Sequence, residues 1–297
     1  MTTDTTTENT TPRVLIIAGS DSGGGAGIQA DIKTCAAYGV YSTTAITAIT
    51  AQNTLGVQAV HMLPAELVTQ QIKSVMDDIG ADVIKIGMLG TQEIIEAVAK
   101  AVDDVDAFVV LDPVMVATSG DSLLDAGAVE AMKNTLIPVC DLVTPNIPEA
   151  QILTGQTLED TDAMTKAGEI LLGMGAYAAL IKGGHMDSPM VFDVLVSEDG
   201  NNLMSGPRVH SRHTHGTGCT LASAIAAGMA LGTPLDAAVL SARDFVYDAI
   251  RTAPKLGGGN GPLNHGLSVK GEELDQTPEI NKANPFANLK DMMSPKS

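Results

Sequence analysis

The chain has 297 residues, a length that permits one large α/β domain or two small ones with a substantial apolar core. Its 17 Lys and Arg residues against 35 Asp and Glu residues give a formal net charge of −18, which argues against nucleic acid or an anionic membrane as a partner. Trp is absent and only 3% of the residues are aromatic, so a platform for base stacking is not expected either.

The chain divides into three predicted segments. Residues 1–12 have neither a basic segment nor an apolar core, which predicts a disordered leader and not a signal peptide. Residues 13–266 show no linker, repeat or break in composition and are predicted to form one domain, and the polar residues 267–297 a tail or extension. No apolar run approaches the roughly 20 residues that a membrane span needs. Cys35, Cys140 and Cys219 are widely spaced without a CxxC pair, which indicates neither a disulfide framework nor a zinc cluster and favours the reducing cytoplasm.

Short apolar runs alternate with helical periodicity along most of the domain. The predicted strands are Val14–Ala18, Thr43–Thr50, Asp82–Met88, Phe108–Leu111, Leu142–Thr144 and Ala178–Lys182, with a hairpin at Val191–Ser197 and Asn202–Ser205. The predicted helices are Ile28–Tyr38, Pro64–Ile79, Thr91–Val102, Ala126–Leu136, Asp162–Met174, Cys219–Leu231 and Leu235–Ala253. Several strands are apolar without alternation, which is typical of parallel strands covered on both faces. The order predicts an α/β fold with a doubly wound, mainly parallel sheet and helices on both faces.

A glycine-rich segment, AGSDSGGGAGIQAD at 18–31, lies between the first strand and the first helix. It is not a dinucleotide fingerprint, because no acidic residue occurs between Asp31 and Glu66, and the chain contains no Walker A motif. Ligands of such sheets bind beyond the carboxyl ends of the strands, where this segment lies. It is therefore either a plain turn or a loop whose amides, with Asp31 behind them, face a small ligand.

The segment His-Thr-His-Gly-Thr-Gly-Cys at 213–219 directly precedes a helical pattern rich in small residues. Gly216 and Gly218 tolerate conformations that let the amides of Thr217, Gly218 and Cys219 point into one space, and the helix adds the positive end of its dipole. This pattern predicts a cradle for a phosphoryl group during transfer. The same helix terminus should lower the pKa of Cys219, so that a thiolate could accept the proton of an attacking hydroxyl. The alternative is a small buried helix residue.

Charged side chains at other strand ends complete the predicted site. Asp112 and Glu149 are carboxylates of the kind that suits Mg²⁺, although Glu149 could instead offset a helix dipole. Lys182 precedes two glycines and could reach a phosphate, or could simply be a solvated lysine. His213 and His215 lack a third ligand at metal spacing, so a zinc site is not predicted.

Seven motifs in this order resemble those of bacterial hydroxymethylpyrimidine/phosphomethylpyrimidine kinases, within the ribokinase superfamily. They are AGSDSGGGAGIQAD, TAITAQNT, KIGML, LDPVM, TPNIPEA, IKGGH and THGTGCT, and the resemblance spans about residues 13–265. It implies ATP-dependent phosphorylation of 4-amino-5-hydroxymethyl-2-methylpyrimidine, and then of its monophosphate, in thiamine biosynthesis. It also implies a ribokinase-like fold, Mg²⁺ and a homodimer.

The same resemblance implies roles for individual residues. Gln52 would hydrogen-bond the aminopyrimidine, since a carboxamide offers both a donor and an acceptor. The residues implied to line the same pocket are Gly19, Ala26, Asp31, Met88 and Val114. The loop at 216–219 would hold the transferring phosphate, Lys182 and Thr214 would lie near the nucleotide, and Glu149 and Asp112 would organise Mg²⁺ through water.

Two other functions stay open at this point. A pyridoxal kinase of vitamin B6 salvage would use the same hydroxymethyl chemistry on a pyridine ring, and Cys219 also occurs in such enzymes, whereas the wider superfamily usually has Asp there. Gln52 favours the pyrimidine, because a pyridine with a ring hydroxyl offers it no 4-amino group. The third reading is a non-catalytic pyrimidine-binding regulator, against which the loop, Cys219, Glu149 and Lys182 occur together.

Overall fold

The centre of the fold is a strand whose side chains are buried on both of its faces. In the computed structural model, which describes residues 11–115, 123–125 and 127–268, strand β1 (Arg13–Asp21) directs Leu15 and Ile17 into one core cluster. Val14 and Ile16 belong to a second cluster on the other face. Successive side chains of a strand point to opposite faces, so the continuous apolar run of β1 requires helices on both sides of the sheet.

The strands in the described part of the chain form one nine-stranded sheet in the order β3-β2-β1-β4-β5-β6-β7-β8-β9. Besides β1, they are β2 (Tyr41–Asn53), β3 (Gly56–Met62), β4 (Val83–Ile86), β5 (Phe108–Leu111), β6 (Leu142–Val143), β7 (Ala178–Lys182), β8 (Met190–Ser197) and β9 (Gly200–Pro207). The six strands from β2 to β7 across the sheet are parallel, whereas β3, β8 and β9 are antiparallel to their neighbours. The parallel strands therefore end at one common edge.

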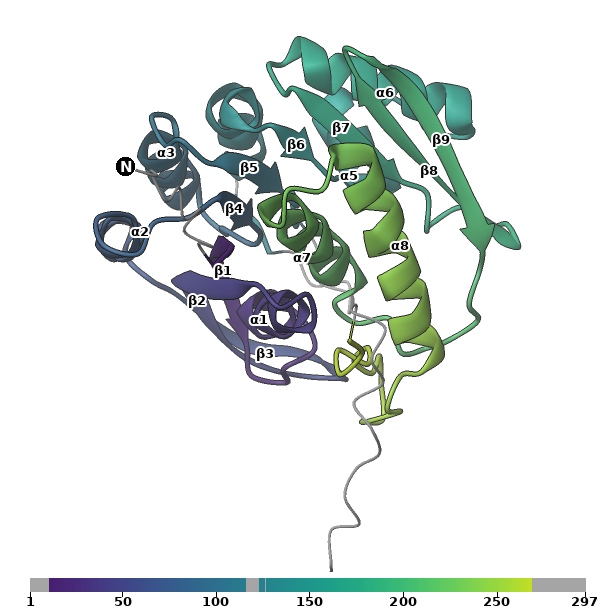
Figure 1. The fold of residues 1–297 in the computed structure, drawn as a ribbon, viewed down its shortest axis with the longest axis horizontal. Helices are drawn as coiled ribbons and strands as arrows, with labels where there is room; N and C mark the ends of the chain where they lie inside the picture. Colours follow the sequence, from purple (N-terminus) through teal and green to yellow (C-terminus); the bar gives the residue numbers. More distant parts are fainter. Residues whose placement is uncertain (1–10, 116–122, 126, 269–297) are drawn as a thin grey trace, which may run out of the picture.

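Two groups of helices cover the two faces. The helices that contribute to the core cluster of Leu15 are α2 (Ala65–Met76), α3 (Gln92–Val102), α4 (Ala128–Ala131), α5 (Ile147–Thr154) and α6 (Thr161–Gly173). The helices of the opposite cluster are α1 (Gly27–Ala37), α7 (Thr217–Ala230) and α8 (Leu235–Arg251), which Figure 1 shows together on one side of the sheet. The predicted fold class, a doubly wound and mainly parallel sheet, is confirmed.

The structure differs from the sequence prediction in several elements. Strand β3 and helix α5 were not predicted as elements. The predicted helix Ala126–Leu136 is a single α-helical turn, α4, followed by a π-helical segment at Met132–Leu136 and a 3₁₀ turn at Ile137–Val139, and its first residue lies outside the described part. The hairpin strands β8 and β9 are longer than predicted and meet in a tight turn with Gly200 at φ +135°.

Most of the predicted leader and tail also lie outside the described residues, as do 116–122. Within residues 11–115, 123–125 and 127–268, no helix is both long and apolar enough to cross a membrane.

Helix α7 links the core to the edge where the parallel strands end. Its residues from Thr220 to Gly228 are all buried, because it packs between α1 and α8 and against β1 and β4. Small side chains allow this close approach, which explains the Ala-rich sequence. Its N-terminus therefore lies at the carboxyl edge of the sheet.

Candidate active site

One large cavity, of about 1130 Å³, opens at the carboxyl edge of the sheet. Almost every site residue predicted from the sequence lines it: Gly19, Ala26, Gln52, Met88, Asp112, Val114, Glu149, Lys182, Thr214, Gly216, Thr217, Gly218 and Cys219. These residues come from the ends of β1, β2, β4, β5 and β7, from α5 and from the segment that opens α7. Segments far apart in the sequence thus converge on one space.

Asp31 is the exception, because it lies behind the cavity wall and not on it. Both of its carboxylate oxygens accept from Lys85 Nζ at 3.0 Å, and Ser223 Oγ donates to Oδ1 at 2.7 Å. The side chains of Asp31 and Lys85 are 0% exposed in the described residues. Burial raises the pKa of Asp31, and Lys85 opposes that rise. Burial alone would lower the pKa of Lys85, but nearby acidic groups, Asp31 first, raise it above its usual value. Asp31 was expected to line the substrate pocket, but it lies behind the cavity wall and bonds Lys85. Lys85 is the member of this pair that lines the cavity.

The segment before α7 is shaped by close backbone approach. Gly216 has φ +84°, and a Cβ at this position would strike the carbonyl oxygen of Gly25. The Thr217 amide and hydroxyl both donate to the Thr214 carbonyl oxygen, at 3.2 and 2.7 Å. The Thr217 amide is therefore already hydrogen-bonded within the loop. Fewer than the three predicted amides remain to bind a phosphoryl group. Gly218 of this loop lies against the charged side chains of Asp112 and Lys182.

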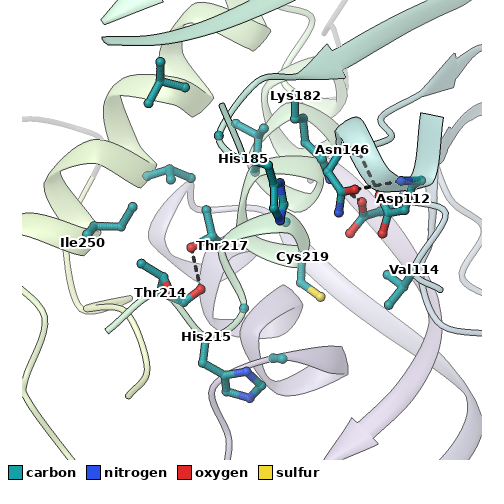
Figure 2. Close-up of a pocket in the computed structure, with 18 of the residues that line it drawn as sticks. Asp112, Val114, Asn146, Lys182, His185, Thr214, His215, Thr217, Cys219 and Ile250 are labelled. Atoms are coloured by element: carbon teal, nitrogen blue, oxygen red, sulfur yellow. Dashed lines mark hydrogen bonds and ion pairs between the residues drawn. The ribbon is translucent and has the colours of Figure 1, made fainter. Parts of the chain in front are cut away.

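Asp112 and Lys182 form an ion pair at the start of α7. Lys182 Nζ lies 2.7 Å from Asp112 Oδ1, and the two side chains are 11% and 3% exposed. A Cβ on Gly218 would lie 3.3 Å from both Lys182 Nζ and Asp112 Oδ2, so the pair sits directly against the loop. Burial alone would lower the pKa of Lys182, but Asp112 and then Glu149 raise it, and the ammonium stays charged. Figure 2 shows Asp112 and Lys182 on one side of Cys219 and His215 beyond it on the other.

Glu149 caps helix α5 as well as facing the cavity. Its Oε2 accepts from the Asn146 amide at 2.8 Å, and Asn146 Oδ1 accepts from the Glu149 amide at 3.0 Å, which is a capping box. Burial raises the pKa of Glu149 to about 7; Lys182 opposes this rise and Asp112 adds to it. Glu149 thus fits both interpretations that the sequence allowed: it caps the start of a helix, and its carboxylate faces the cavity.

The donor set decides what kind of cation could bind here. No group of three or more His, Cys, Asp and Glu side chains in the described part of the chain could hold a metal ion by itself. Asp112 and Glu149 offer two carboxylates, which suits an ion that keeps most of its waters and takes further ligands from phosphate. The residues present therefore fit Mg²⁺ and do not fit a metal held entirely by protein side chains.

Cys219 does not have the lowered pKa that its position at a helix terminus suggested. Burial raises the pKa of its thiol to about 12; Lys85 opposes this rise, while Asp31 and Asp112 add to it. Two nearby carboxylates and the low polarity of the surroundings outweigh the helix dipole, which contributes only about 0.3–1 kcal/mol. In the ligand-free chain the pKa of Cys219 therefore does not favour a thiolate.

We expect the Cys219 thiol to react slowly with iodoacetamide. At pH 8 a thiol of this pKa is ionised in only about one molecule in 10⁴, so alkylation should be at least ~100-fold slower than for a free thiol of ordinary pKa. Peptide mapping by mass spectrometry measures the rate at Cys219, with the Cys219→Ser variant identifying the peptide. Rapid stoichiometric labelling of Cys219 would contradict the neutral thiol.

Asp21 and His215 form a second polar contact in the cavity wall, which was not predicted from the sequence. Asp21 accepts from the amides of Gly23, Gly25 and Ala26 at 2.7, 3.0 and 2.9 Å, and His215 Nε2 lies 2.9 Å from its Oδ2. This contact ties the glycine-rich loop to the segment before α7. An aspartate followed by three glycines within four residues is the signal that could have predicted an Asx-type turn here.

Arg208 organises another loop in the cavity wall. Its guanidinium donates to the carbonyl oxygens of Ser188, Gly184 and Met186 at 2.7, 2.8 and 2.6 Å. These three bonds hold the loop after β7, which carries His185 on the cavity wall. Burial lowers the pKa of His185, and the positive charges of Lys182 and Arg208 lower it further, so the imidazole is neutral.

The chain is similar to known kinases over most of its length. A family model described as phosphomethylpyrimidine kinase matches residues 21–264. The chain is 46% identical over 260 residues to a hydroxymethylpyrimidine/phosphomethylpyrimidine kinase of Streptomyces coelicolor, covering 88% of this chain and 96% of the relative. It is 47% identical over 258 residues to a bifunctional thiamine biosynthesis protein of Geobacter sulfurreducens, covering 86% of this chain and 53% of that longer protein.

A solved structure with the same arrangement is the pyridoxal kinase of Staphylococcus aureus in complex with AMP-PCP and pyridoxal. Its TM-score is 0.80 at 36% sequence identity, covering 87% of this chain and 94% of that one. The relatives therefore include kinases for two different ring systems on one fold.

Proposed function

The chain belongs to the phosphomethylpyrimidine kinase family, and on this premise we propose how its site divides the work of the reaction. It is an ATP-dependent kinase of thiamine biosynthesis that phosphorylates 4-amino-5-hydroxymethyl-2-methylpyrimidine and then its monophosphate. One observation supports the assignment of roles most strongly. The buried Lys182–Asp112 pair, with Lys182 Nζ 2.7 Å from Asp112 Oδ1, lies against Gly218 at the N-terminus of α7.

In this proposal the pyrimidine lies between the end of β1 and the end of β2. Gly19, Ala26, Gln52, Met88 and Val114 line that part of the cavity, and Gln52 bonds the ring. The nucleotide extends toward the loop held by Arg208, past Thr214 and Lys182. The hydroxymethyl group and the terminal phosphate then meet at the loop that opens α7.

The protein's own groups act by position and charge. Lys182 and the positive end of α7 stabilise the negative charge of the phosphoryl group in transit, and the packed wall excludes water. Asp112 and Glu149 would hold Mg²⁺ together with nucleotide phosphates, and the ion would neutralise phosphate charge there. The neutral Cys219 thiol contributes a wall and no proton acceptor, so most of the rate comes from positioning, as is usual in phosphoryl transfer.

Turnover on three substrates tests this function directly. With ATP and Mg²⁺, we expect the hydroxymethylpyrimidine and its monophosphate both to yield the diphosphate, separated from reactants by charge. Pyridoxal is the second candidate substrate, favoured by the structural likeness to a pyridoxal kinase. If pyridoxal were the best of the three, the vitamin B6 assignment would replace the present one. Absence of turnover on all three would favour a non-catalytic binding protein.

Replacing Gln52 with Ala should weaken binding of the aminopyrimidine by about 1–3 kcal/mol, the range for a buried hydrogen-bond partner left unpaired. Titration calorimetry with the hydroxymethylpyrimidine measures the change. Thr69→Ala is a suitable control, because Thr69 is on α2 and its hydroxyl has one hydrogen-bond partner among residues 11–115, 123–125 and 127–268, the Glu66 carbonyl. Unchanged affinity in Gln52→Ala would remove Gln52 from substrate recognition.

We further propose that the protein acts in the cytoplasm as a homodimer. All three cysteines are free, and Cys35 and Cys140 are buried, which suits a reducing compartment. Sedimentation of the purified chain tests the dimer.

A further inference from the structure

Four polar side chains on the cavity wall form a connected series of hydrogen bonds: Asp21, His215, Gln52 and Thr50. His215 Nε2 lies 2.9 Å from Asp21 Oδ2 and 3.3 Å from Gln52 Nε2. The other end of the Gln52 amide, Oε1, lies 3.3 Å from Thr50 Oγ1. Thr50 Oγ1 in turn donates to the Ser20 carbonyl oxygen at 2.9 Å. The donors and acceptors along this series can be counted.

Asp21 accepts hydrogen bonds from three backbone amides. Burial raises the pKa of this carboxyl group, but the bonds from His215, Ala26 and Gly23 outweigh burial and hold the pKa below its usual value. Asp21 is therefore a carboxylate and can only accept hydrogen bonds. His215 Nε2, at 2.9 Å, must then carry a hydrogen and donate it to Asp21, whether the ring is neutral or charged.

A proton on His215 Nε2 constrains Gln52. An N–H that donates to Asp21 cannot also accept from an amide nitrogen at 3.3 Å. A hydrogen bond to a carboxylate is stronger than one between neutral groups, so the bond to Asp21 decides where the hydrogen of His215 Nε2 lies. The Gln52 atom that faces His215 must be an acceptor, which is its carbonyl oxygen. A half-turn of the terminal amide exchanges oxygen and nitrogen within the same space.

Thr50 satisfies the other end of the turned amide. Its hydroxyl proton is given to the Ser20 carbonyl, which leaves its oxygen lone pair to accept from the amide nitrogen of Gln52. The Gln52 oxygen then shares the hydrogen that His215 Nε2 donates to Asp21, and the Gln52 nitrogen donates to Thr50 Oγ1. One lone pair of the Gln52 oxygen and one N–H remain for a ligand.

We propose that Asp21, His215 and Thr50 are positioning residues that fix the Gln52 carboxamide with its oxygen toward His215 and its nitrogen toward Thr50. This rests on the proposed function only in taking the ligand to be the ring of the substrate. The remaining edge of the amide accepts on the His215 side and donates on the Thr50 side. It pairs with a ring that carries an amino group beside a ring nitrogen, and it opposes a ring with a carbonyl beside a ring N–H. The series therefore determines specificity for the order of donor and acceptor on the ring.

Nuclear Overhauser effects in the isotope-labelled, ligand-free protein test the orientation itself. We expect the Gln52 side-chain amide protons to show contacts to the methyl group of Thr50 and none to the ring C–H protons of His215. Contacts to the His215 ring in place of the Thr50 methyl would overturn the proposal. This measurement needs no turnover, so it stands even if the proposed kinase function fails.

Substrate discrimination tests the consequence. The probes are the 4-amino-5-hydroxymethylpyrimidine and its 4-oxo counterpart, which presents the opposite order of donor and acceptor. We expect kcat/KM of the unaltered protein to favour the amino compound by at least ~100-fold, because a mismatched ring leaves buried polar groups unpaired. Thr50→Val should reduce this preference at least ~10-fold, mainly through KM, with kcat for the amino compound changed less than about threefold.

Two matched variants separate positioning from stability. Thr50→Ser keeps the hydroxyl and should restore the discrimination. Thr34→Val removes a buried hydroxyl that, within the described part of the chain, bonds the Ala30 carbonyl alone, at 2.7 Å, and it should keep the discrimination of the unaltered protein. An unchanged preference in a folded Thr50→Val protein would overturn the proposal.

Discussion

Replacing Lys182 with Met should lower kcat/KM for ATP by at least ~100-fold, the range for losing one group that stabilises transition-state charge. Lys182 is the cation beside the loop that opens α7, with its Nζ 2.7 Å from Asp112 Oδ1. The whole chain carries a net charge of −18, so an anionic nucleotide depends on local cations and not on a general field. The substitution would also leave the Asp112 carboxylate, only 2% exposed, facing phosphate without its partner.

Steady-state kinetics with ATP varied at saturating pyrimidine measures this loss. Lys182→Arg keeps the charge and should recover part of the activity, since Arg binds phosphate but fills the space differently. Lys100→Met makes the same change in net charge at an exposed position at the end of α3, and its kinetics should match the unaltered protein. Activity of folded Lys182→Met within threefold of the unaltered protein would remove Lys182 from phosphoryl transfer.

The fold could be predicted where one physical signal dominates. Strand β5 is a continuous apolar run and β7 is apolar up to Lys182, and helices α3 and α6 begin at the side-chain caps Thr91 and Asp160. Strand β3 gave no such signal, because it is an antiparallel edge strand whose side chains are mostly exposed. Its structure comes from pairing with β2 and not from burial.

Helix α5 was missed for a different reason. It is only eight residues long, with a Pro in its first turn, and was read as part of a motif at a strand end. Its capping box, Asn146 with Glu149 three residues later, is the local signal that identifies its start. Glu149 of this capping box is also the carboxylate that lines the cavity. The sequence therefore allowed both a helix-capping role and a site role for it.

The sequence could predict that most of the residues it singled out line one cavity, but it could not predict the side chains that support them. Strand ends and glycine loops brought the cavity residues together because parallel strands end at one edge. The partners of those residues are distant in sequence: Lys85 is 54 positions from Asp31, and His215 is 194 positions from Asp21. No periodicity or spacing encodes such pairs. The pKa of Cys219 depends on them too, so it could not be derived from the helix terminus alone.

The Lys85–Asp31 pair leads to the largest expected change in stability. Lys85→Met should lower the free energy of unfolding by about 3–5 kcal/mol, because it leaves a buried carboxylate without its cation. Asp31 is 0% exposed and, of its hydrogen-bond partners among the described residues, would keep the Ser223 hydroxyl alone, at 2.7 Å. For a chain of this size the loss corresponds to a fall in Tm of roughly 6–20 °C. Urea unfolding followed by circular dichroism measures it.

The double variant Lys85→Met/Asp31→Leu distinguishes an orphaned charge from lost packing. Replacing both members of a buried pair by apolar groups is often neutral or stabilising, so the double variant should be more stable than Lys85→Met alone. Lys73→Met is the control: its pair with Asp77 has side chains 75% and 60% exposed, and its loss should cost less than about 0.5 kcal/mol. If Lys85→Met were as stable as Lys73→Met, the pair would contribute no stability. The role of Asp31 would then be to hold Lys85 in its place on the cavity wall. Lys85 Nζ lies there beside Gly87, since a Cβ added at Gly87 would be 2.9 Å from it.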